Sequence, residues 1–235
     1  KRWASWFGRE TGVDGFRLDA IKHINDWFIR DFMLHVRGEF GDDFYDVGEY
    51  SYYDGMDIEE YLHNVEHQID LFDVALQYNF KQCSEDGPGY DMRKIFNNSL
   101  VAAHPMLTVT YVDNHDSHLH EGESYVQGWF KPLAYALILL REDGYPCLFL
   151  GDYYGIGGDD PRPDMQWIID QLLDVRRDFA YGDQEDYFDH EHVVGWIRRG
   201  DEDHPDGCVV IMSNAEGGVK PMFVGTDYAG SAWYD

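Results

Sequence analysis

The stretch Val13-Asp14-Gly15-Phe16-Arg17-Leu18-Asp19 alternates apolar and polar residues and ends on a carboxylate. Side chains two residues apart in a strand share a face, so Arg17 and Asp19 lie on one side and Phe16 and Leu18 on the other. The pattern predicts a short strand over residues 13–18 with charge at its C-terminal end. Apolar segments that recur at intervals of roughly 27 to 38 residues predict further buried strands over residues 44–47, 71–76, 107–112 and 145–150.

Patterns typical of helices separate these strands. Residues at helical spacing predict a helix that ends near Gly41, with the apolar positions Ile24, Trp27, Phe28, Phe32 and Val36. Helices are also predicted over residues 1–10, which Gly12 can terminate, over 129–142, with Pro132 in the first turn, and over 163–180. Strand, helix and strand at this spacing indicate parallel βα units, and five in a row suit the latter part of an eight-stranded barrel.

After residue 180 the pattern changes to short alternating runs between turns, over residues 193–197, 208–213, 221–224 and 231–234. Such runs predict a small antiparallel β domain. The fold class is therefore α/β, the C-terminal part of a (β/α)8 barrel followed by a partial antiparallel β-sandwich domain. We place the barrel at residues 1–184 and the incomplete β domain at residues 185–235, with the boundary near 181–186.

Composition excludes several classes of partner. The 235 residues are 44% apolar and carry a formal net charge of −27, which indicates a folded chain with an acidic surface. This charge repels phosphate backbones and anionic lipids, so we expect neither nucleic-acid nor membrane binding, whereas a neutral sugar is unaffected. We expect a monomer. The three cysteines Cys83, Cys147 and Cys208 have no paired spacing and are expected to be free thiols.

Carboxylates stand at the ends of three predicted strands. Asp19 ends the first strand, Glu49 follows the second, and Asp116 follows the strand over residues 107–112. In a parallel barrel the active site lies at the C-terminal ends of the strands. Retaining glycoside hydrolysis needs a carboxylate nucleophile and an acid/base carboxyl about 5–5.5 Å apart. Any one of these acids alone would be interpreted as a solvated loop residue, but three at strand ends indicate this chemistry.

Three motifs give the chain a family resemblance. Gly15-Phe16-Arg17-Leu18-Asp19-Ala20-Ile21-Lys22-His23, Gly48-Glu49-Tyr50 and Val112-Asp113-Asn114-His115-Asp116 closely resemble, in this order, three of the four signature regions of glycoside hydrolase family 13. Residues 129–141 and 151–155 look like the end of the barrel in bacterial liquefying and cytoplasmic α-amylases. Residues 208–214 look like their C-terminal β domain. The resemblance covers nearly the whole chain.

The resemblance implies a role for each matching residue. Asp19 would be the nucleophile, Glu49 the general acid/base, and Asp116 the residue that grips sugar hydroxyls and stabilises the transition state. The remaining residues would bind substrate: Arg17, which holds Asp19, His115 at the cleavage site, and Lys22 and His23 on the leaving-group side. The backbone carbonyl of His23 would also bind a structural Ca²⁺ ion, most of whose ligands would lie outside this chain.

The implied function is endo-hydrolysis of α-1,4-glucosidic bonds in starch, maltodextrin or glycogen with net retention. A transglycosylase or a debranching or maltogenic relative is the nearest alternative, and a non-catalytic glucan-binding member is another. Resemblance to the cytoplasmic branch, together with unpaired cysteines, predicts a cytoplasmic protein, with secretion as the alternative. The fourth signature, Asp-x-x-x-Asn-His, is absent, so we expect a partial chain that is inactive and poorly folded by itself; starch hydrolysis by it would refute this.

Three other patterns compete with this interpretation. His63-Asn64-Val65-Glu66-His67 fits the H-x-x-E-H spacing of inverted zinc peptidases, although an exposed helix face explains it equally simply. A second group of possible metal ligands follows Asp116, namely His118, His120, Glu121 and Glu123, for which sugar contact or solvation is the simpler hypothesis. Tyrosines after strand ends could stack on glucose or only pack: Tyr50, Tyr52, Tyr53, Tyr153 and Tyr154.

Overall fold

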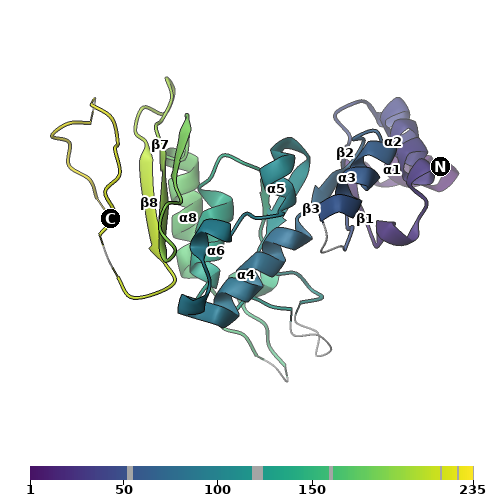
Figure 1. Cartoon of the computed structure of the whole chain (residues 1–235). Helices are drawn as coiled ribbons and strands as arrows, with labels where there is room; N and C mark the ends of the chain where they lie inside the picture. Colours follow the sequence, from purple (N-terminus) through teal and green to yellow (C-terminus); the bar gives the residue numbers. More distant parts are fainter. Residues whose placement is uncertain (52–54, 118–123, 159–160, 218, 227, 235) are drawn as a thin grey trace. The chain divides into compact units, whose positions relative to one another are not determined.

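The structure is a computed structural model, and it describes residues 1–51, 55–117, 124–158, 161–217, 219–226 and 228–234. The chain divides into two compact units, which are described one at a time. Residues 1–79, 96–112 and 143–148 form the first unit, and residues 80–95, 113–142 and 149–235 form the second. Elements carry the labels of Figure 1.

The first unit is built on a five-stranded parallel sheet whose strands stand in the order of the sequence. The strands are β1 (Gly15–Leu18), β2 (Tyr45–Gly48), β3 (Asp70–Phe72), β4 (Thr108–Tyr111) and β5 (Tyr145–Cys147). All five predicted strands are confirmed; β2 keeps its predicted length and is shifted by one residue, and the other four are shorter than predicted. The third and fifth predictions ran too far because residues 74–76 already belong to α4 and residue 150 to α7.

Helices connect these strands, as the βα pattern predicted. The first unit contains α1 (Arg2–Thr11), η1 (Ile21–His23), α2 (Asp26–Phe40), α3 (Gly55–Asn64), α5 (Leu100–Ala103) and η4 (Pro105–Leu107), and α4 (Val74–Asp86) begins in it. Helix α1 ends at Gly12, whose φ of 66° is left-handed, and the Gly12 N–H donates to the Gly8 carbonyl. A glycine adopts this conformation without steric cost, so the predicted stop is confirmed.

The buried face of α2 differs from the predicted one. Ile29, Phe32, Met33 and Val36 pack into the core, at the spacing i, i+3, i+4 and i+7. Of the residues predicted to form the apolar face, Trp27 is 55% exposed, and Ile24 and Phe28 are exposed as well. The sequence pattern therefore located the helix correctly, and its predicted positions Phe32 and Val36 do face the core. The predicted face is wrong only at its N-terminal end, because apolar residues occur on both sides of this helix.

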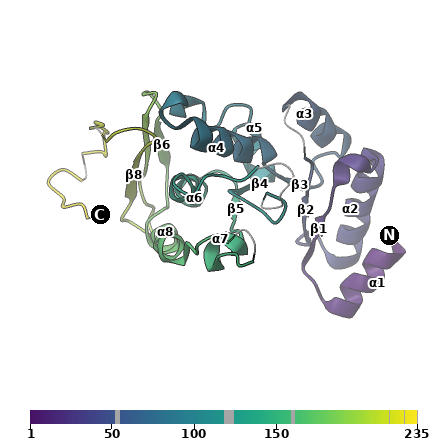
Figure 2. The same ribbon diagram turned by 90° about the horizontal axis from the view of Figure 1, so that it is seen from below.

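The second unit combines helices with an antiparallel sheet. Its elements are the end of α4, η2 (Gly87–Gly89), η3 (Met92–Lys94), α6 (Lys131–Leu139), α7 (Leu150–Tyr154), α8 (Gln166–Asp178), β6 (Gln184–Tyr187), β7 (Val193–Arg198) and β8 (Cys208–Ser213). Strand β7 is central and pairs antiparallel with β6 and β8. Helices α6 and α8 pack against each other (Figure 2).

Two predicted strands of this sheet are wrong and one strand was missed. Residues 221–224 and 231–234 form no strand in the described part of the chain. Side chains take up the backbone groups of the first segment, since Phe223 N–H donates to the Tyr187 hydroxyl and Arg199 donates to the Val224 carbonyl, both at 3.0 Å. Strand β6 was missed because its residues Gln184, Glu185 and Asp186 are polar. The domain boundary near residue 184 stays a prediction.

The C-terminal end of α6 is tied to the antiparallel sheet. The indole N–H of the fully buried Trp196 on β7 donates to the Leu140 carbonyl at 3.2 Å, and Arg176 donates to the Leu139 carbonyl. These contacts satisfy carbonyls that a helix end leaves without partners. Arg141 completes the joint, because its two terminal nitrogens lie 2.6 and 2.9 Å from the Asp186 carboxylate.

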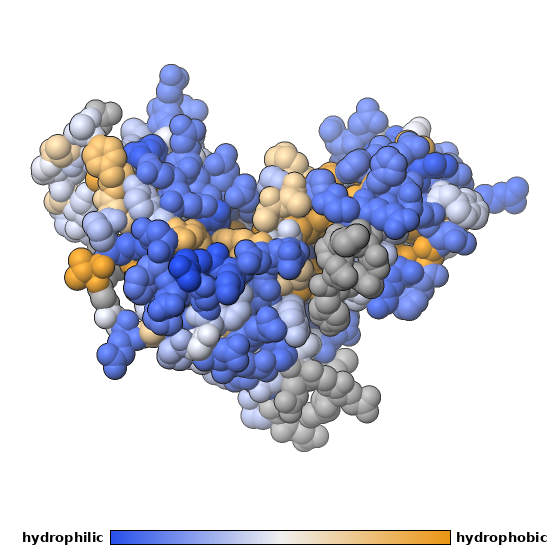
Figure 3. All heavy atoms as spheres, viewed as in Figure 1, coloured by the Kyte–Doolittle hydropathy of each residue, from blue (hydrophilic) through white to orange (hydrophobic). Residues whose placement is uncertain are grey.

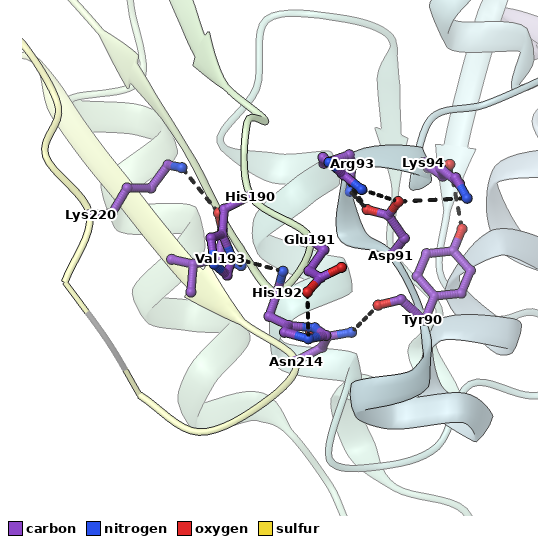
Figure 4. A network of polar contacts seen from close by, with 10 residues as sticks. All are labelled: Tyr90, Asp91, Arg93, Lys94, His190, Glu191, His192, Val193, Asn214 and Lys220. Atoms are coloured by element: carbon purple, nitrogen blue, oxygen red, sulfur yellow. Dashed lines mark hydrogen bonds and ion pairs between the residues drawn. The ribbon is translucent and has the colours of Figure 1, made fainter.

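A side-chain amide fastens β8 to the turn after α4 (Figure 4). The Nδ2 atom of Asn214 donates to the carbonyls of Gly87 and Tyr90, at 2.8 Å in each case. Asn214 is 4% exposed, and its backbone N–H donates to the His192 carbonyl. Through its side chain and its backbone, Asn214 therefore joins the end of β8 to the turn at residues 87–90 and to His192.

The outer surface is as polar as the net charge implies, and the face seen in Figure 3 is mostly hydrophilic. Cys83, Cys147 and Cys208 are free thiols, as predicted. Across the described ranges, no helix has the length and apolar character needed to cross a membrane.

A buried carboxylate on β2 makes the stability of the first unit depend on pH. Asp46 is 1% exposed, and among the described residues neither of its carboxylate oxygens has a hydrogen-bond partner of good geometry. Arg37 Nη2 lies 3.9 Å away, too far to offset the desolvation. Burial raises the pKa of Asp46 to about 6, against the opposing effect of Arg37. The ionised form is therefore disfavoured in the folded protein.

We predict that Asp46→Asn stabilises the protein at pH 8 and has little effect at pH 4. Because the folded-state pKa lies above the unfolded value, stability is lost as pH rises from about 4 through about 6, and the amide removes that loss. The expected gain at pH 8 is roughly 3 kcal/mol. Urea unfolding at both pH values measures it, with the exposed Asp43→Asn as the control; an equal change at both pH values would contradict the prediction.

Candidate active site

Parallel pairing of β1 and β2 brings the first two predicted carboxylates together. Arg17 on β1 pairs with Val47, and Leu18 pairs with Gly48, so Asp19 and Glu49 follow neighbouring strand ends. The segments that follow β1 and β2 stay hydrogen-bonded beyond the strand ends. Glu49 N–H donates to the Leu18 carbonyl at 2.9 Å, and Ile21 N–H donates to the Glu49 carbonyl at 3.0 Å. The positions of both carboxylates thus follow from the register.

One guanidinium contacts both carboxylates. Arg17 Nη1 donates to Asp19 Oδ1, and Arg17 Nη2 donates to Glu49 Oε2 at 2.7 Å. The Asp19 side chain is 74% exposed, whereas the Glu49 side chain is only 18% exposed. A fork of donors between two acids fixes their separation and keeps both oxygens oriented. The Asp19 carboxylate is therefore accessible to a ligand, whereas the Glu49 carboxylate is largely shielded from solvent.

Glu49 is held by two further donors that the sequence did not indicate. The Ser51 hydroxyl donates to Glu49 Oε1 at 3.0 Å, and the Ala20 N–H lies 3.4 Å from Oε2. Ala20 has a left-handed φ of 46°, which is uncommon for a residue with a side chain and is typical of tight functional turns. Ser51 stands two residues after Glu49, so a hydroxyl next to a strand-end acid was the available signal.

The two residues predicted on the leaving-group side lie in the same turn. Lys22 and His23 belong to η1, directly after Ala20, and both are exposed. Lys22 Nζ donates to the Ser51 carbonyl at 3.0 Å, so it links the segments that follow β1 and β2. The His23 N–H donates to the Ala20 carbonyl. Their roles in substrate binding stay predictions.

His115 and Asp116 lie in the second unit, on the segment that follows β4. Their side chains are 66% and 56% exposed and lie 3.4 Å apart, from His115 Nε2 to Asp116 Oδ2. Asn114 shapes this turn, because its Oδ1 accepts from the N–H groups of Asp116 at 3.0 Å and Ser117 at 2.9 Å. The neighbouring ligand-like residues His118, His120, Glu121 and Glu123 lie outside the described residues.

A buried cluster of charges lies beside this turn and was not predicted from the sequence. Lys131 Nζ contacts Asp152 Oδ1 and lies 2.7 Å from Asp113 Oδ2, and the Tyr135 hydroxyl donates to Asp152 Oδ2 at 2.7 Å. Burial raises the pKa of Asp113, while Lys131 opposes the rise. A lysine in the first turn of an apolar helix was the only sequence signal, and such lysines are usually solvated.

The described tyrosines divide between packing and exposure. Tyr50 lies against the core and its ring centroid is 4.3 Å from that of Tyr61, which indicates a packing role. The Tyr153 hydroxyl donates to Asp170 at 2.7 Å. Tyr154 is 69% exposed, and its ring meets that of Tyr153 edge to face with the centroids 4.7 Å apart. Tyr52 and Tyr53 lie outside the described residues.

The helical geometry required by the zinc-peptidase hypothesis is not present. Helix α3 ends at Asn64, and Glu66 and His67 both have left-handed φ angles, 53° and 56°. His63 and His67 therefore do not stand on one helical face. Within the described ranges, no group of three or more His, Cys, Asp or Glu side chains is arranged to hold a metal ion.

The same finding bears on calcium. A Ca²⁺ ion takes six to eight oxygen ligands. The predicted contribution of this chain is one backbone carbonyl, that of His23, and the described residues supply no carboxylate cluster around it. These residues do not by themselves fit a calcium site, so no step of the chemistry is assigned to the ion.

Comparison with known proteins gives relatives over the full length of the chain. The chain is 46% identical over 239 residues to an α-amylase of Bacillus licheniformis, 48% over 237 residues to a glucan 1,4-α-maltohexaosidase of a Bacillus species, and 42% over 245 residues to a cytoplasmic α-amylase of Escherichia coli. Each match covers 100% of this chain and 47%, 46% and 49% of the relative. The chain therefore spans about half the length of these relatives. No model of a protein family matches it.

Solved structures support the fold. An α-amylase of Anoxybacillus superposes with a TM-score of 0.61 at 24% identity, over 85% of this chain and 48% of that one. An α-amylase of Geobacillus thermoleovorans in complex with acarbose gives the same TM-score at 22% identity. The predicted fold class, a partial (β/α)8 barrel followed by an antiparallel β domain, is confirmed.

We predict that the purified protein contains no stoichiometric zinc and that His63→Ala does not change its metal content. The reason is that α3 ends at Asn64, so His63 lies on the helix and His67 lies beyond it, and the two side chains do not share a helical face. Elemental analysis after dialysis against zinc measures this, with Asn64→Ala as the matched control. One zinc per chain that disappears with His63→Ala would restore the metal-site hypothesis.

Proposed function

The chain belongs to the α-amylase family of glycoside hydrolases, family 13, and from this premise we propose that its residues serve endo-hydrolysis of α-1,4-linked glucans with net retention. The observation that carries the proposal is the pair of strand-end carboxylates on one guanidinium. Retaining hydrolysis needs two carboxyl groups about 5–5.5 Å apart, and a shared arginine holds two acids as near neighbours.

The exposures of the two acids suit different roles. Asp19, the exposed carboxylate, is proposed as the nucleophile that attacks the anomeric carbon and forms a covalent glycosyl-enzyme. Glu49, the sheltered carboxyl, is proposed as the general acid that gives a proton to the departing glycosidic oxygen. It then accepts a proton from water, which attacks the same anomeric carbon and releases the sugar from Asp19. Two inversions leave the anomeric configuration unchanged.

The neighbouring residues are proposed to bind and orient the sugar. Arg17 holds the nucleophile in place, because its guanidinium donates to Asp19 Oδ1. Asp116 and His115 follow β4, a strand of the same parallel sheet as β1 and β2, and are proposed to grip sugar hydroxyls next to the bond that breaks. Lys22 and His23 belong to η1, in the turn that follows Asp19, and are proposed to contact the leaving-group side.

The wider setting also remains a proposal. The proposed partner is a neutral α-glucan such as starch, maltodextrin or glycogen, and the protein is proposed to act as a monomer. Similarity to the cytoplasmic α-amylase of E. coli supports a cytoplasmic location. Calcium is proposed to bind near the His23 carbonyl only with ligands beyond the described residues, and residues 1–184 and 185–235 are proposed as the barrel and β domain.

We predict that Asp19→Asn and Glu49→Gln each lower kcat for starch hydrolysis by about 10³-fold or more, because each removes a group that forms or breaks a bond. The natural polypeptide that carries these residues is assayed, and NMR of the first product formed reports its anomer. Asp14→Asn, a neighbouring exposed acid outside the site, is the control and should keep full activity. Initial β-anomers, or full activity in either variant, would contradict the mechanism.

A second outcome concerns what accepts the glycosyl group. Similarity to a glucan 1,4-α-maltohexaosidase supports release of one preferred oligosaccharide as the alternative to random endo-cleavage. We predict that maltohexaose at low concentration yields shorter maltooligosaccharides and that no product exceeds the substrate in length. Chromatography of the products measures this; chains longer than six glucose units would favour a transglycosylase.

A further inference from the structure

Lys131 is a buried cation held between two carboxylates in the second unit. Its side chain is 6% exposed, and those of Asp113 and Asp152 are 0% and 2% exposed. The Nζ atom lies 2.7 Å from Asp113 Oδ2 and also contacts Asp152 Oδ1. Tyr135, one turn further along α6 and fully buried, donates its hydroxyl to the other oxygen of Asp152. Two carboxylates from different segments therefore meet on one helix.

Each of the two carboxylates belongs to a segment that follows a strand of the parallel sheet. Asp113 follows β4 and opens the segment that carries His115 and Asp116. Its second oxygen, Oδ1, accepts from the Val126 N–H at 3.2 Å, so Asp113 ties together the two ends of residues 113–126. Asp152 lies in α7, after β5. Lys131 thus links the two segments through their acids.

A continuous set of contacts leads from Lys131 to Asp116. Asp113 forms an ion pair with the lysine, and the next residue, Asn114, accepts through Oδ1 from the N–H groups of Asp116 and Ser117. The Ser117 hydroxyl, in a residue only 5% exposed, returns a hydrogen bond to the Asn114 carbonyl at 2.9 Å. The turn that presents Asp116 is therefore closed on itself, and Asp113 connects it to α6.

Stability alone does not explain a charge cluster in this place. Burying an ion pair costs desolvation energy that its attraction often fails to exceed, and apolar replacements of the same volume are often neutral or stabilising. The cluster also holds two acids for one cation, which leaves an excess of negative charge when both are ionised. A buried pair of this kind does, however, specify one geometry.

We propose that Lys131 is a positioning residue of the active site, which fixes the segment carrying His115 and Asp116 through its ion pair with Asp113. This inference rests on the proposed function. A group misplaced by about 1 Å can reduce turnover by about 10²-fold. Lys131 touches no reacting atom in this account, and its effect on turnover passes through Asp113.

The first experiment compares Lys131→Met with Arg141→Met in the natural polypeptide. Both changes remove a cation from an ion pair in the second unit, but Arg141 pairs with Asp186 on β6, whereas Lys131 pairs with Asp113. We expect Lys131→Met to lower kcat for maltohexaose by 30-fold to 100-fold, per active site titrated, with KM changed less than threefold. Arg141→Met should lower the unfolding temperature and leave kcat per active site unchanged.

A double-mutant cycle tests whether the effect passes through Asp113. Asp113→Asn keeps an oxygen for the Val126 N–H and removes the charge that Lys131 binds. If Lys131 acts through Asp113, the double variant loses no more kcat than Lys131→Met does by itself. Additive losses, or equal losses of kcat in Lys131→Met and Arg141→Met, would overturn the proposal.

Hydrogen exchange gives a readout that does not need catalysis. We expect the Val126 amide to lose at least tenfold of its protection in Lys131→Met and to keep it in Arg141→Met, because only the former releases Asp113. If the parent protein does not hydrolyse glucans, the proposed function fails while this measurement still decides whether Lys131 holds the segment. Unchanged exchange at Val126 in Lys131→Met would overturn the positioning role.

Discussion

The candidate site depends on one constraint, the parallel register between β1 and β2. Pairing of Leu18 with Gly48 brings the ends of both strands to the same level, and the next residue of each strand is an acid. Arg17, one position before Leu18, then reaches both acids with one guanidinium. A shift of one residue would turn Arg17 to the opposite face and separate the pair. The backbone bonds between Glu49, Leu18 and Ile21 extend this register past the strand ends and so protect it.

Buried carboxylates recur through the molecule, and each has a different environment. Asp73 accepts backbone N–H groups from Leu76 and Val101 at 2.9 and 2.8 Å, so the start of α4 and the start of α5 share one acceptor. Asp113 and Asp152 share the ammonium of Lys131. Asp46 lies 3.9 Å from the Arg37 guanidinium. A chain with 45 acidic residues thus keeps most of its charge in water and places a few carboxylates where directional bonds decide the local geometry.

Periodicity predicted what depends on local sequence. The five parallel strands and the ends of α1 and α2 at Gly12 and Gly41 follow from alternation and from glycine conformation, and they are confirmed. Long-range packing decided the rest. The core-facing side of α2 depends on what lies opposite it, and β6 is a strand only because β7 pairs with its polar residues. Ser51 and Lys131 could not be assigned from the sequence, because a hydroxyl or an amine acquires a role only when folding brings an acid to it. The roles of Asp19, Glu49 and Asp116 still await experiment.

The joint at the end of α6 limits how this fold can be recombined. Trp196 and Asp186 on the antiparallel sheet bind Leu140 and Arg141, so the β domain is recognised by the last residues of a barrel helix. Exchange of this domain with that of a relative would leave a buried indole and a guanidinium opposite foreign partners unless residues 139–141 and Arg176 are exchanged with it. Crossover points in a chimera, whether made by nature or in the laboratory, should therefore fall before α6 rather than at the linker after α8. The antiparallel β domain and helix α6 should therefore be exchanged together, as one unit.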